Sequence, residues 1–288
     1  MQPSTDNNLK SLSYYKTGGD CDYLFKPTCT EEVQESMLFI KQQACEYFLL
    51  GAGSNTLVLD NHWPGAVVCF AGLKHIHLGK DCVSVGAGVS NTDLSLFCQR
   101  HALDSLAWMY KLPGQIGASV RMNAKCYGSQ MSDVVKAVTV VRADASRYTY
   151  TDSELKACFR GYKDTSFMDS GELIVAVDFA VKSACAQKIK DKMQACFLDR
   201  EKKGHFDYPS CGCVFKNDYH PQVSLPAGLM ISSCGLMGLQ YRGAQISPKH
   251  ANFIYNNKSA TSDDILELSF KVRDTVWQKL GVWLSYEM

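Results

Sequence analysis

The chain has 288 residues, a length that is typical of two compact domains. Its 30 Lys and Arg residues nearly balance its 29 Asp and Glu residues, and a net charge of +1 argues against a protein whose main ligand is a nucleic acid or an acidic membrane. A hydrophobic fraction of 46% with 20% charged residues excludes a largely disordered chain.

No segment has the pattern of a membrane helix or a signal peptide. The longest apolar run, residues 66–73, is far shorter than the ~20 residues that a membrane helix needs. The first eight residues are polar and acidic and contain no apolar core of a secretory signal. We therefore expect a soluble, cytoplasmic protein that has no membrane partner.

The thirteen cysteines are scattered, without a CxxC pair or a regular spacing. An odd, irregular set is a poor disulfide framework and a poor zinc site. We expect most of these thiols to be small buried side chains in a reducing compartment, and we expect no metal site.

In the first part of the chain, one helix and three strands are predicted. Glu31 and Glu32 open a segment whose apolar residues recur at helical spacing, which predicts a helix from Thr30. Short apolar runs bounded by Gly, Asn or Pro predict strands at residues 47–50, 56–59 and 66–70.

The helical and strand patterns continue to alternate through most of the chain. Asn91 is a candidate cap for a helix that runs to His101, and β-branched residues predict strands at 134–141 and 173–181. A polar, Lys-rich helix is predicted at about residues 183–203, and we place the border of a second domain at its start. The predicted domains are therefore residues 13–182 and 183–288, of the α/β or α+β class.

The last helix has clear signals at both ends. Ser262 and two acids precede its apolar stripe, and Gly281 stands where a left-handed residue commonly ends a helix.

A glycine-rich loop joins the first two predicted strands. Gly51, Ala52, Gly53, Ser54 and Asn55 would let backbone N–H groups approach a bound phosphate or pyrophosphate, with the side chains of Ser and Asn as further donors. The third glycine of a dinucleotide fingerprint and the Gly-Lys-Ser/Thr of a P-loop are both missing. Taken alone, the same residues are compatible with a tight β-turn.

A second cluster of small residues runs from Pro113 to Ala124 and continues to Gly128. It is typical either of a loop before a small-residue helix packed on a flat group, or of a helix entry with close packing.

Together these loops carry a specific resemblance. Further motifs follow in register at residues 162–167, 209–217, 226–229, 243–254 and 281–287. In this order the motifs resemble those of the UDP-N-acetylenolpyruvoylglucosamine reductase family over roughly residues 13–288, and the length is similar to that of its shorter branch.

The resemblance implies an α+β protein with a vanillyl-alcohol-oxidase-type (PCMH-type) FAD-binding fold of two subdomains. A C-terminal α/β domain would bind the UDP-sugar. Residues 51–55 should cradle the pyrophosphate of FAD. The other expected cofactor-binding residues are Pro113, Gly114, Ile116, Gly117, Ala118 and Asn123.

The family reduces an enolpyruvyl ether on UDP-N-acetylglucosamine to a lactyl ether, a step towards the peptidoglycan precursor. NADPH reduces the flavin, hydride passes from flavin N5 to the β-carbon, and the enolate that results is protonated at the α-carbon. Such a site needs groups that stabilise negative charge and an acid that is placed to deliver a proton.

Three residues match the catalytic positions of the family. Lys163 stands in place of an arginine beside the substrate carboxylate, and Glu287 is the near-terminal glutamate that helps to stabilise the enolate. Cys213 stands where most of the family has the serine that donates the proton. Lysine keeps the positive charge of arginine without its bidentate fork, so Arg160 is a candidate to share the role.

Four residues match substrate positions: Tyr162, Lys203, Asn217 and His250. For Lys203 a solvated helix end is an equally good interpretation, and for His250 the alternative is a structural histidine. The expected partners of a monomeric enzyme are thus a UDP-sugar and NADPH, with no nucleic acid. Two alternatives stay open: another flavin-dependent oxidase or dehydrogenase of this fold, and a degenerate protein that binds a flavin or nucleotide-sugar without catalysis.

Overall fold

The computed structural model of the chain describes residues 1–161, 163–217 and 225–288. Its contacts divide these residues into two compact units, each with its own apolar core. Unit 1 consists of Met1–Asn7, Cys21–Ala52 and Pro64–Phe197, and unit 2 of Asn8–Asp20, Gly53–Trp63 and Leu198–Met288.

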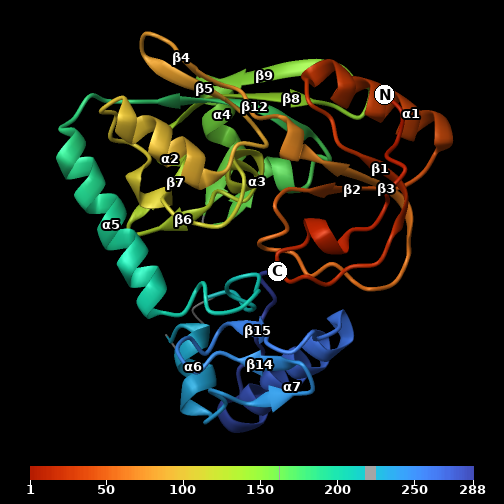
Figure 1. The fold of residues 1–288 in the computed structure, drawn as a ribbon, viewed down its shortest axis with the longest axis vertical. Helices are drawn as coiled ribbons and strands as arrows, with labels where there is room; N and C mark the ends of the chain where they lie inside the picture. Colours follow the sequence, from red (N-terminus) through yellow and green to blue (C-terminus); the bar gives the residue numbers. More distant parts are fainter. Residues whose placement is uncertain (162, 218–224) are drawn as a thin grey trace. The chain divides into compact units, whose positions relative to one another are not determined.

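Unit 1 is built around a five-stranded antiparallel sheet of strand order β4-β5-β12-β8-β9 (Figure 1). Its strands are β4 (Ile76–Leu78), β5 (Cys82–Gly86), β8 (Val135–Val141), β9 (Arg147–Thr151) and β12 (Leu173–Ala180). A second sheet of order β1-β3-β2 contains β1 (Cys21–Phe25), β2 (Tyr47–Leu50) and β3 (Trp63–Cys69), with β2 and β3 parallel.

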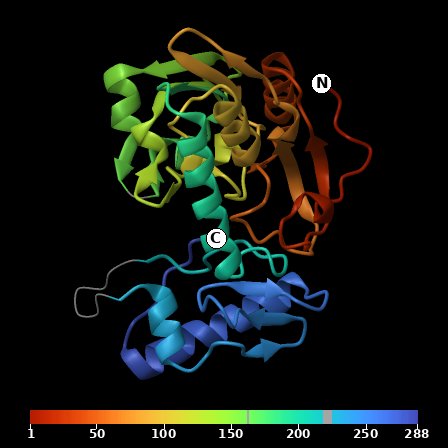
Figure 2. The same ribbon diagram turned by 60° about the vertical axis from the view of Figure 1, so that its left-hand side comes forward.

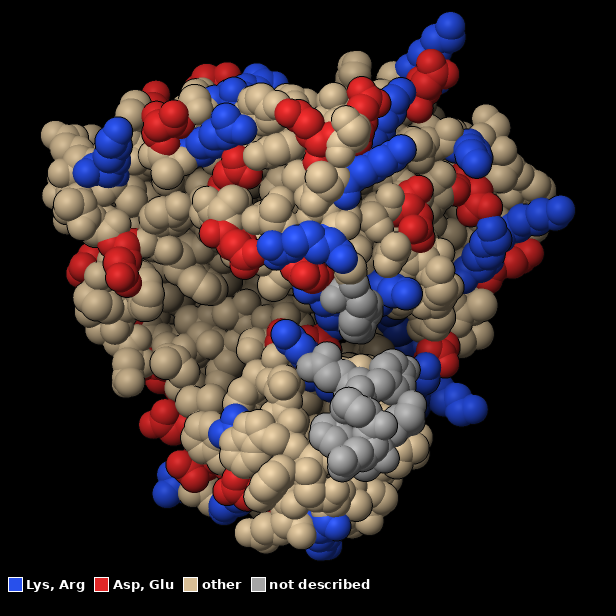
Figure 3. Space-filling model, turned by 180° about the vertical axis from the view of Figure 1, so that it is seen from behind, with Lys and Arg blue, Asp and Glu red and all other residues tan. Residues whose placement is uncertain are grey.

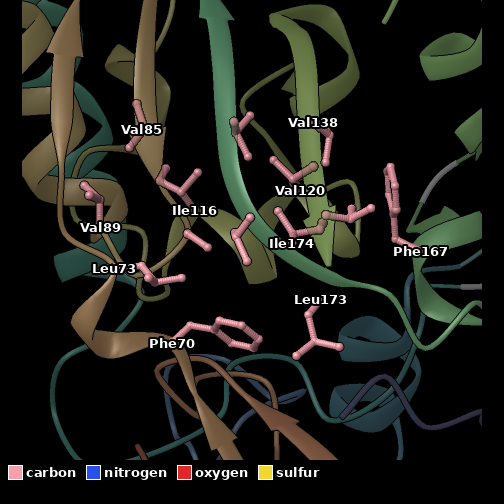
Figure 4. Packing of buried hydrophobic residues seen from close by; sticks show 14 of the residues in the cluster. Phe70, Leu73, Val85, Val89, Ile116, Val120, Val138, Phe167, Leu173 and Ile174 are labelled. Carbon is pink, nitrogen blue, oxygen red and sulfur yellow. The ribbon is translucent and has the colours of Figure 1, made fainter. Parts of the chain in front are cut away.

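Unit 1 contains five α-helices among its described residues: α1 (Thr30–Gln43), α2 (Asn91–Arg100), α3 (Ile116–Arg121), α4 (Asp152–Cys158) and α5 (Ala186–Lys202), the last of which continues into unit 2. Of these, α1, α3 and α4 pack against the larger sheet. α3 packs against β12 and β5, and Figure 4 shows its Ile116 and Val120 in the core beside Ile174 of β12. Two short hairpins complete the unit: β6 (Lys125–Cys126) with β7 (Ser129–Gln130), and β10 (Phe159–Gly161) with β11 (Asp164–Thr165).

Unit 2 contains a small antiparallel sheet of β13 (Gln240–Tyr241), β14 (Ala244–Ile246) and β15 (Ile254–Asn256). Helix α7 (Ser262–Leu280) packs against all three strands and against α6 (Ala227–Ser233), as the blue part of the chain in Figure 2 shows. Gly281 has φ +68° and ends α7 as the sequence predicts.

The two N-terminal segments of unit 2 explain why its limits differ from the expected domain border at residue 183. Tyr15 is fully buried in unit 2, where its hydroxyl donates to the carbonyl of Ile254 at 3.0 Å. Asn256 donates in turn to the carbonyl of Tyr15 at 2.8 Å. Ile189 and Met193, in the first half of α5, pack on Ala107 of unit 1. The first part of this helix therefore belongs to unit 1, and the border between the units falls within the helix and not at its start.

Two local predictions are wrong. Residues 56–59 form no strand, because their backbone bonds to loops: the carbonyl of Thr56 accepts from Cys211 Sγ at 2.9 Å. The hydroxyl of Ser90 caps α2 by accepting from Asp93 N, whereas Asn91 is buried and bonds to Ser119. Helix α7 begins at Ser262, and the hydroxyl of Thr261 caps it by accepting from Asp264 N.

The cysteines are also less buried than expected. No disulfide joins any of the thirteen, but only six are buried, and Cys29 and Cys185 are exposed. Two of the partly exposed thiols, Cys45 and Cys126, also pack against the core of unit 1.

Charged side chains of both signs are interspersed over the face of the molecule in Figure 3, as the near-zero net charge predicts. Among the described residues, no helix combines the length and the hydropathy that crossing a bilayer would require.

Candidate functional site

A narrow cavity of about 40 Å³ lies in unit 1 beside the end of β2 and the start of α3. The described residues around it are mostly small or apolar; they are Leu49, Gly51, Phe70, Ala87, Gln115, Gly117, Ala118, Arg121 and Ile174. Three of them are residues that the sequence predicts to bind FAD: Gly51, Gly117 and Ala118.

Backbone contacts hold the loop before α3 in place. The N–H groups of Ile116 and Gly117 donate to the carbonyls of Val89 and Ala87, each at 2.9 Å. Asn91 N donates to the carbonyl of Gly114, which has φ +131°, so the loop is tied at both ends. This backbone conformation suits glycine at 114.

The glycines of this cradle cannot be enlarged without movement. A Cβ on Gly117 would lie 2.7 Å from the Cβ of Ala87, and one on Gly51 would lie 3.0 Å from the Cβ of Ala118. Such a cradle of small residues lets a flat group approach the backbone closely, as a bound flavin nucleotide requires. The residues present therefore fit FAD.

Asn123 has a different position from the other predicted cofactor residues. It is buried with φ +45°, its amide donates to the carbonyl of Gly161 at 3.0 Å, and its side-chain oxygen accepts from Ser132 N at 3.0 Å. Both polar atoms thus brace the β6–β7 and β10–β11 region of unit 1.

The loop at residues 51–55 crosses the limit between the two units, since Gly51 and Ala52 belong to unit 1 and the other three residues to unit 2. Gly53 has φ +63°, and its carbonyl accepts from Tyr14 N at 3.4 Å and from Cys211 Sγ at 3.3 Å. The side chain of Asn55 donates to the carbonyl of Glu287 at 2.9 Å. In unit 2 this loop therefore supports the segment that carries a predicted catalytic residue.

Lys163 lies in unit 1 on the tight connection between β10 and β11, with φ +52°. The nearby guanidinium of Arg160 forms ion pairs with Asp164 at 2.6 Å and Asp169 at 2.5 Å, which raise the pKa of Arg160 above its ordinary value. Two carboxylates thus already hold this guanidinium, which weakens the idea that Arg160 shares the role of Lys163. Tyr162, the neighbouring predicted substrate residue, lies outside the described residues.

Unit 2 contains a larger cavity of about 320 Å³ at the start of α6. Three of the predicted site residues line it: Cys213, Asn217 and His250. The other described residues of its wall are Pro226, Gly228, Leu229, Ser232, Met237, Lys249, Ala251 and Asn252.

The two neighbouring cysteines have opposite environments. Cys213 lines the cavity and is partly exposed, whereas Cys211 is 1% exposed and donates to the carbonyl of Thr56. Burial raises the pKa of the Cys211 thiol to about 12. Between them Gly212 has φ +74°, which breaks the alternation of an extended strand and separates the two thiols.

A frame of hydrogen bonds holds the segment that carries Cys213. On one side, Asn252 bonds to Phe215 twice: its side-chain oxygen accepts from Phe215 N at 3.0 Å and its amide donates to Phe215 O at 2.8 Å. On the other side, Glu287 N donates to the carbonyl of Val214 at 2.8 Å. The backbone of Glu287 is thus directly bonded to the residue that follows Cys213.

The remaining substrate candidates have partners within unit 2. Asn217 accepts from Ala227 N at 3.0 Å and so organises the first turn of α6. Lys203 lies at the end of α5 and forms an i,i+4 ion pair with Asp199 at 2.7 Å. Lys249, on the wall of the cavity, is paired with Asp207 at 2.8 Å.

His250 is one of two neighbouring, partly buried imidazoles. Its ring lies 4.3 Å from that of Phe253 and 5.8 Å from that of His205, centre to centre. Burial lowers the pKa of both histidines, and that of His205 falls to about 4, helped by the nearby His250 and Arg200. Both rings are therefore neutral at neutral pH, and His250 offers the cavity a polar, uncharged nitrogen.

The depressed pKa of His205 predicts a pH-dependent stability. Between its ordinary value of ~6.5 and about 4, the unfolded chain binds a proton that the folded chain does not, so the free energy of unfolding should fall as pH falls. Over that window the loss from this residue should approach roughly 3 kcal/mol. Urea unfolding at pH 7.0, 5.5 and 4.5 should show this decrease in the natural chain. A His205→Phe variant keeps an aromatic ring on Phe253, and its free energy of unfolding should decrease by about 3 kcal/mol less over the same range. Equal slopes for the two chains would contradict the assignment.

Sequence reasoning passed over two polar residues of the unit 1 cavity and, within the motif at residues 243–254, Lys249 and Asn252 of the unit 2 cavity. Gln115 stands at the unassigned position of the Pro113–Gly117 motif, and Arg121 lies one turn further on. Lys249 directly precedes His250. These residues lie within motifs of the sequence, which marks them as candidates, but the direction in which each side chain points depends on the fold.

Two family models match successive parts of the chain. A model of the FAD binding domain family matches residues 21–150, and a model of the UDP-N-acetylenolpyruvoylglucosamine reductase C-terminal domain matches residues 204–288. The UDP-N-acetylenolpyruvoylglucosamine reductase of Treponema denticola is 32% identical over 294 residues, covering 97% of this chain and 90% of its own. That of Latilactobacillus sakei is also 32% identical, over 99% and 91% of the two chains.

Solved structures with a similar fold include a member of the same family. The crystal structure of the UDP-N-acetylenolpyruvylglucosamine reductase of Thermus caldophilus superposes with a TM-score of 0.78 at 30% identity, over 97% of this chain and 95% of that one. 6-Hydroxy-D-nicotine oxidase of Arthrobacter nicotinovorans shares the fold alone, with a TM-score of 0.50 at 17% identity over 64% and 42% of the chains. The predicted fold class, an α+β protein with a vanillyl-alcohol-oxidase-type FAD-binding fold, is therefore confirmed.

The glycine cradle in unit 1, the cavity with its cysteine in unit 2 and the match along nearly the whole chain have one common explanation. This chain belongs to the UDP-N-acetylenolpyruvoylglucosamine reductase family, whose members are flavin-dependent oxidoreductases of peptidoglycan synthesis.

Proposed function

We propose that this protein reduces the enolpyruvyl ether of UDP-N-acetylglucosamine to the corresponding lactyl ether, with NADPH as the reductant, in the cytoplasm. The observation that carries the proposal is the unit 2 cavity, which is lined by Cys213, Asn217 and His250 and lies in the part of the chain that matches the reductase family. We assign flavin binding to unit 1 with the loop at residues 51–55, and UDP-sugar binding to unit 2.

For the cofactor, the residues that would hold FAD are the small ones of the unit 1 cradle, Gly51, Gly114, Gly117 and Ala118, with Pro113 and Ile116 shaping the loop. The rest of the glycine loop, Ala52, Gly53, Ser54 and Asn55, offers backbone N–H groups and short side chains to a pyrophosphate. When bound, FAD supplies the hydride chemistry that no amino-acid side chain provides.

Cys213 is the proposed proton donor. Its thiol lines the cavity, and the hydrogen-bond frame around Val214 and Phe215 holds its backbone in place. A thiol gives up a proton more readily than a serine hydroxyl, so cysteine can replace the serine of the family in protonating the α-carbon of an enolate. Cys211 is unsuited to this role because it is buried and its pKa is raised to about 12.

Two further residues are proposed to stabilise negative charge on the substrate. Lys163 supplies a positive charge for the carboxylate, and the carboxyl group of Glu287 acts beside the developing enolate. What supports Glu287 is its backbone bond to Val214, which links it to the Cys213 segment. What supports Lys163 is its place in the family motif.

The UDP-sugar is proposed to contact Asn217 and His250 within the cavity, and Tyr162 and Lys203 outside its described wall. The neutral ring of His250 can accept or donate a hydrogen bond without attracting the negative charge of a diphosphate, and Lys203 can supply that attraction.

The decisive experiment separates the two half-reactions. NADPH added without oxygen to the FAD-loaded protein should bleach the flavin absorbance near 450 nm, and the enolpyruvyl UDP-sugar should then restore it in a single exponential. A flavin that NADPH does not reduce would indicate a degenerate binding protein. Reoxidation by oxygen or an alcohol-derived acceptor, but not by the UDP-sugar, would indicate an oxidase or dehydrogenase of the same fold.

A further inference from the structure

Gln115 is the feature of the unit 1 cavity that no family motif explains. Gln115 is 9% exposed, and its side-chain oxygen Oε1 is buried without a hydrogen-bond partner among the described residues. An unsatisfied buried carbonyl costs roughly 1–3 kcal/mol, so a protein seldom keeps one that has no use.

The side chain of Gln115 points into the cradle. Gln115 lies on the cavity wall, and its Oε1 is 3.6 Å from the position that a Cβ on Gly51 would take. The oxygen thus faces the open side of the residue that begins the glycine loop. A side chain at position 51 would fill part of the space in front of it, and glycine leaves that space free for a ligand.

The other polar side chain of this wall is already engaged. Arg121 donates through Nη1 to the carbonyl of Glu172 at 3.2 Å and through Nη2 to that of Met168 at 3.0 Å. The rest of the described wall consists of apolar side chains and glycine. Within the described wall, Gln115 is therefore the side chain that presents a buried polar atom without a partner.

The backbone of Gln115 is held independently of its side chain. Its carbonyl accepts from Ser119 N at 2.9 Å, and an isolated β-bridge pairs it with Ser90. The side-chain amide is thus presented from a rigid support, which is what a specific ligand contact requires.

We propose that Gln115 is a cofactor-binding residue whose carboxamide forms a hydrogen bond with bound FAD and so adds to the affinity that the small-residue cradle provides. The carboxamide can accept from a donor such as a hydroxyl or ring N–H group, and after rotation by 180° it can donate to an anionic oxygen. The inference rests on FAD being the cofactor of unit 1.

The test measures FAD binding directly, in the absence of NADPH and substrate. The apoprotein is titrated with FAD and the quenching of flavin fluorescence gives Kd. A Gln115→Leu variant, which keeps the approximate size of the side chain and removes its polar group, should weaken binding by about 5- to 50-fold, the loss expected for one buried hydrogen bond. A shift of the flavin absorption bands in any complex that still forms provides a second readout.

A Gln115→Glu variant identifies the polar group of FAD that is contacted. If the carboxamide accepts from a hydroxyl or N–H group, glutamate should bind FAD more tightly than leucine does. If it donates to the pyrophosphate, glutamate should bind more weakly than leucine because two negative charges would meet.

The matched control is Gln34→Leu. Gln34 is another glutamine of unit 1, which donates to the carbonyl of Ala145 at 2.7 Å and is not part of the cavity wall. This variant should lower thermal stability without changing Kd. If the natural protein binds FAD and Gln115→Leu binds it equally well, the inference about Gln115 is wrong; if the natural protein does not bind FAD, the cofactor assignment itself is wrong.

Discussion

Replacing Cys213 with alanine is expected to slow the substrate-dependent reoxidation of the flavin by at least about 100-fold, while NADPH reduces the flavin at the normal rate. Loss of a placed general acid typically costs 10²- to 10⁴-fold in the step that it serves. The thiol lines the unit 2 cavity, and the truncated side chain has no group that could deliver the proton. Stopped-flow absorbance at 450 nm records each half-reaction separately.

The matched control for this experiment is Cys211→Ala. Cys211 is two residues away, but its thiol is buried and donates to the carbonyl of Thr56, so this change should reduce stability and leave the reoxidation rate nearly normal. A Cys213→Ala enzyme that turns over at the natural rate would show that water or another residue donates the proton. A slow Cys211→Ala enzyme with normal stability would transfer the role to Cys211.

Replacing Asn252 with alanine should lower the free energy of unfolding of unit 2 by roughly 2–4 kcal/mol. The side chain is 2% exposed and satisfies both the N–H and the C=O of Phe215, so its loss leaves two buried backbone groups without these bonds. Because these bonds also hold the Cys213 segment, the Michaelis constant for the UDP-sugar should rise. Urea unfolding and steady-state kinetics measure the two effects.

The comparison for Asn252 is Asn257→Ala. Asn257 is a partly exposed asparagine of the same unit that donates to the side chain of Gln245 at 2.8 Å, so its removal leaves no buried backbone group unpaired and should cost less than about 1 kcal/mol. Similar losses of unfolding free energy for the two variants would mean that the pair of hydrogen bonds from Asn252 to Phe215 contributes no more than an exposed hydrogen bond does.

The regular elements could be predicted from the sequence where local signals agree with the fold. Glu31 and Glu32 at the start of α1 and Gly281 after α7 are such signals, and both helices form where their patterns indicate. Residues 56–59 have the composition of a strand but no neighbouring strand to pair with, and the sequence does not reveal the partner of a strand.

For the site, the motifs indicate which residues matter but not what surrounds them. Cys213 and His250 line the same cavity, yet 37 positions separate them in the sequence. Whether Gln115 faces a ligand or solvent depends on the packing of α3 against its sheet, which no local pattern encodes. Likewise, only the fold shows that Tyr15 belongs to the core of unit 2.

Unit 2 is assembled from three separate stretches of the chain, and this affects how it can fold during synthesis. As the polypeptide leaves the ribosome, unit 1 has all its residues once position 197 has emerged. Residues 8–20 and 53–63, by contrast, must wait for residues 198–288, and the partners of Tyr15 are Ile254 and Asn256. Until then the aromatic side chain has no core to enter, so the nascent chain carries exposed apolar surface that a chaperone would recognise.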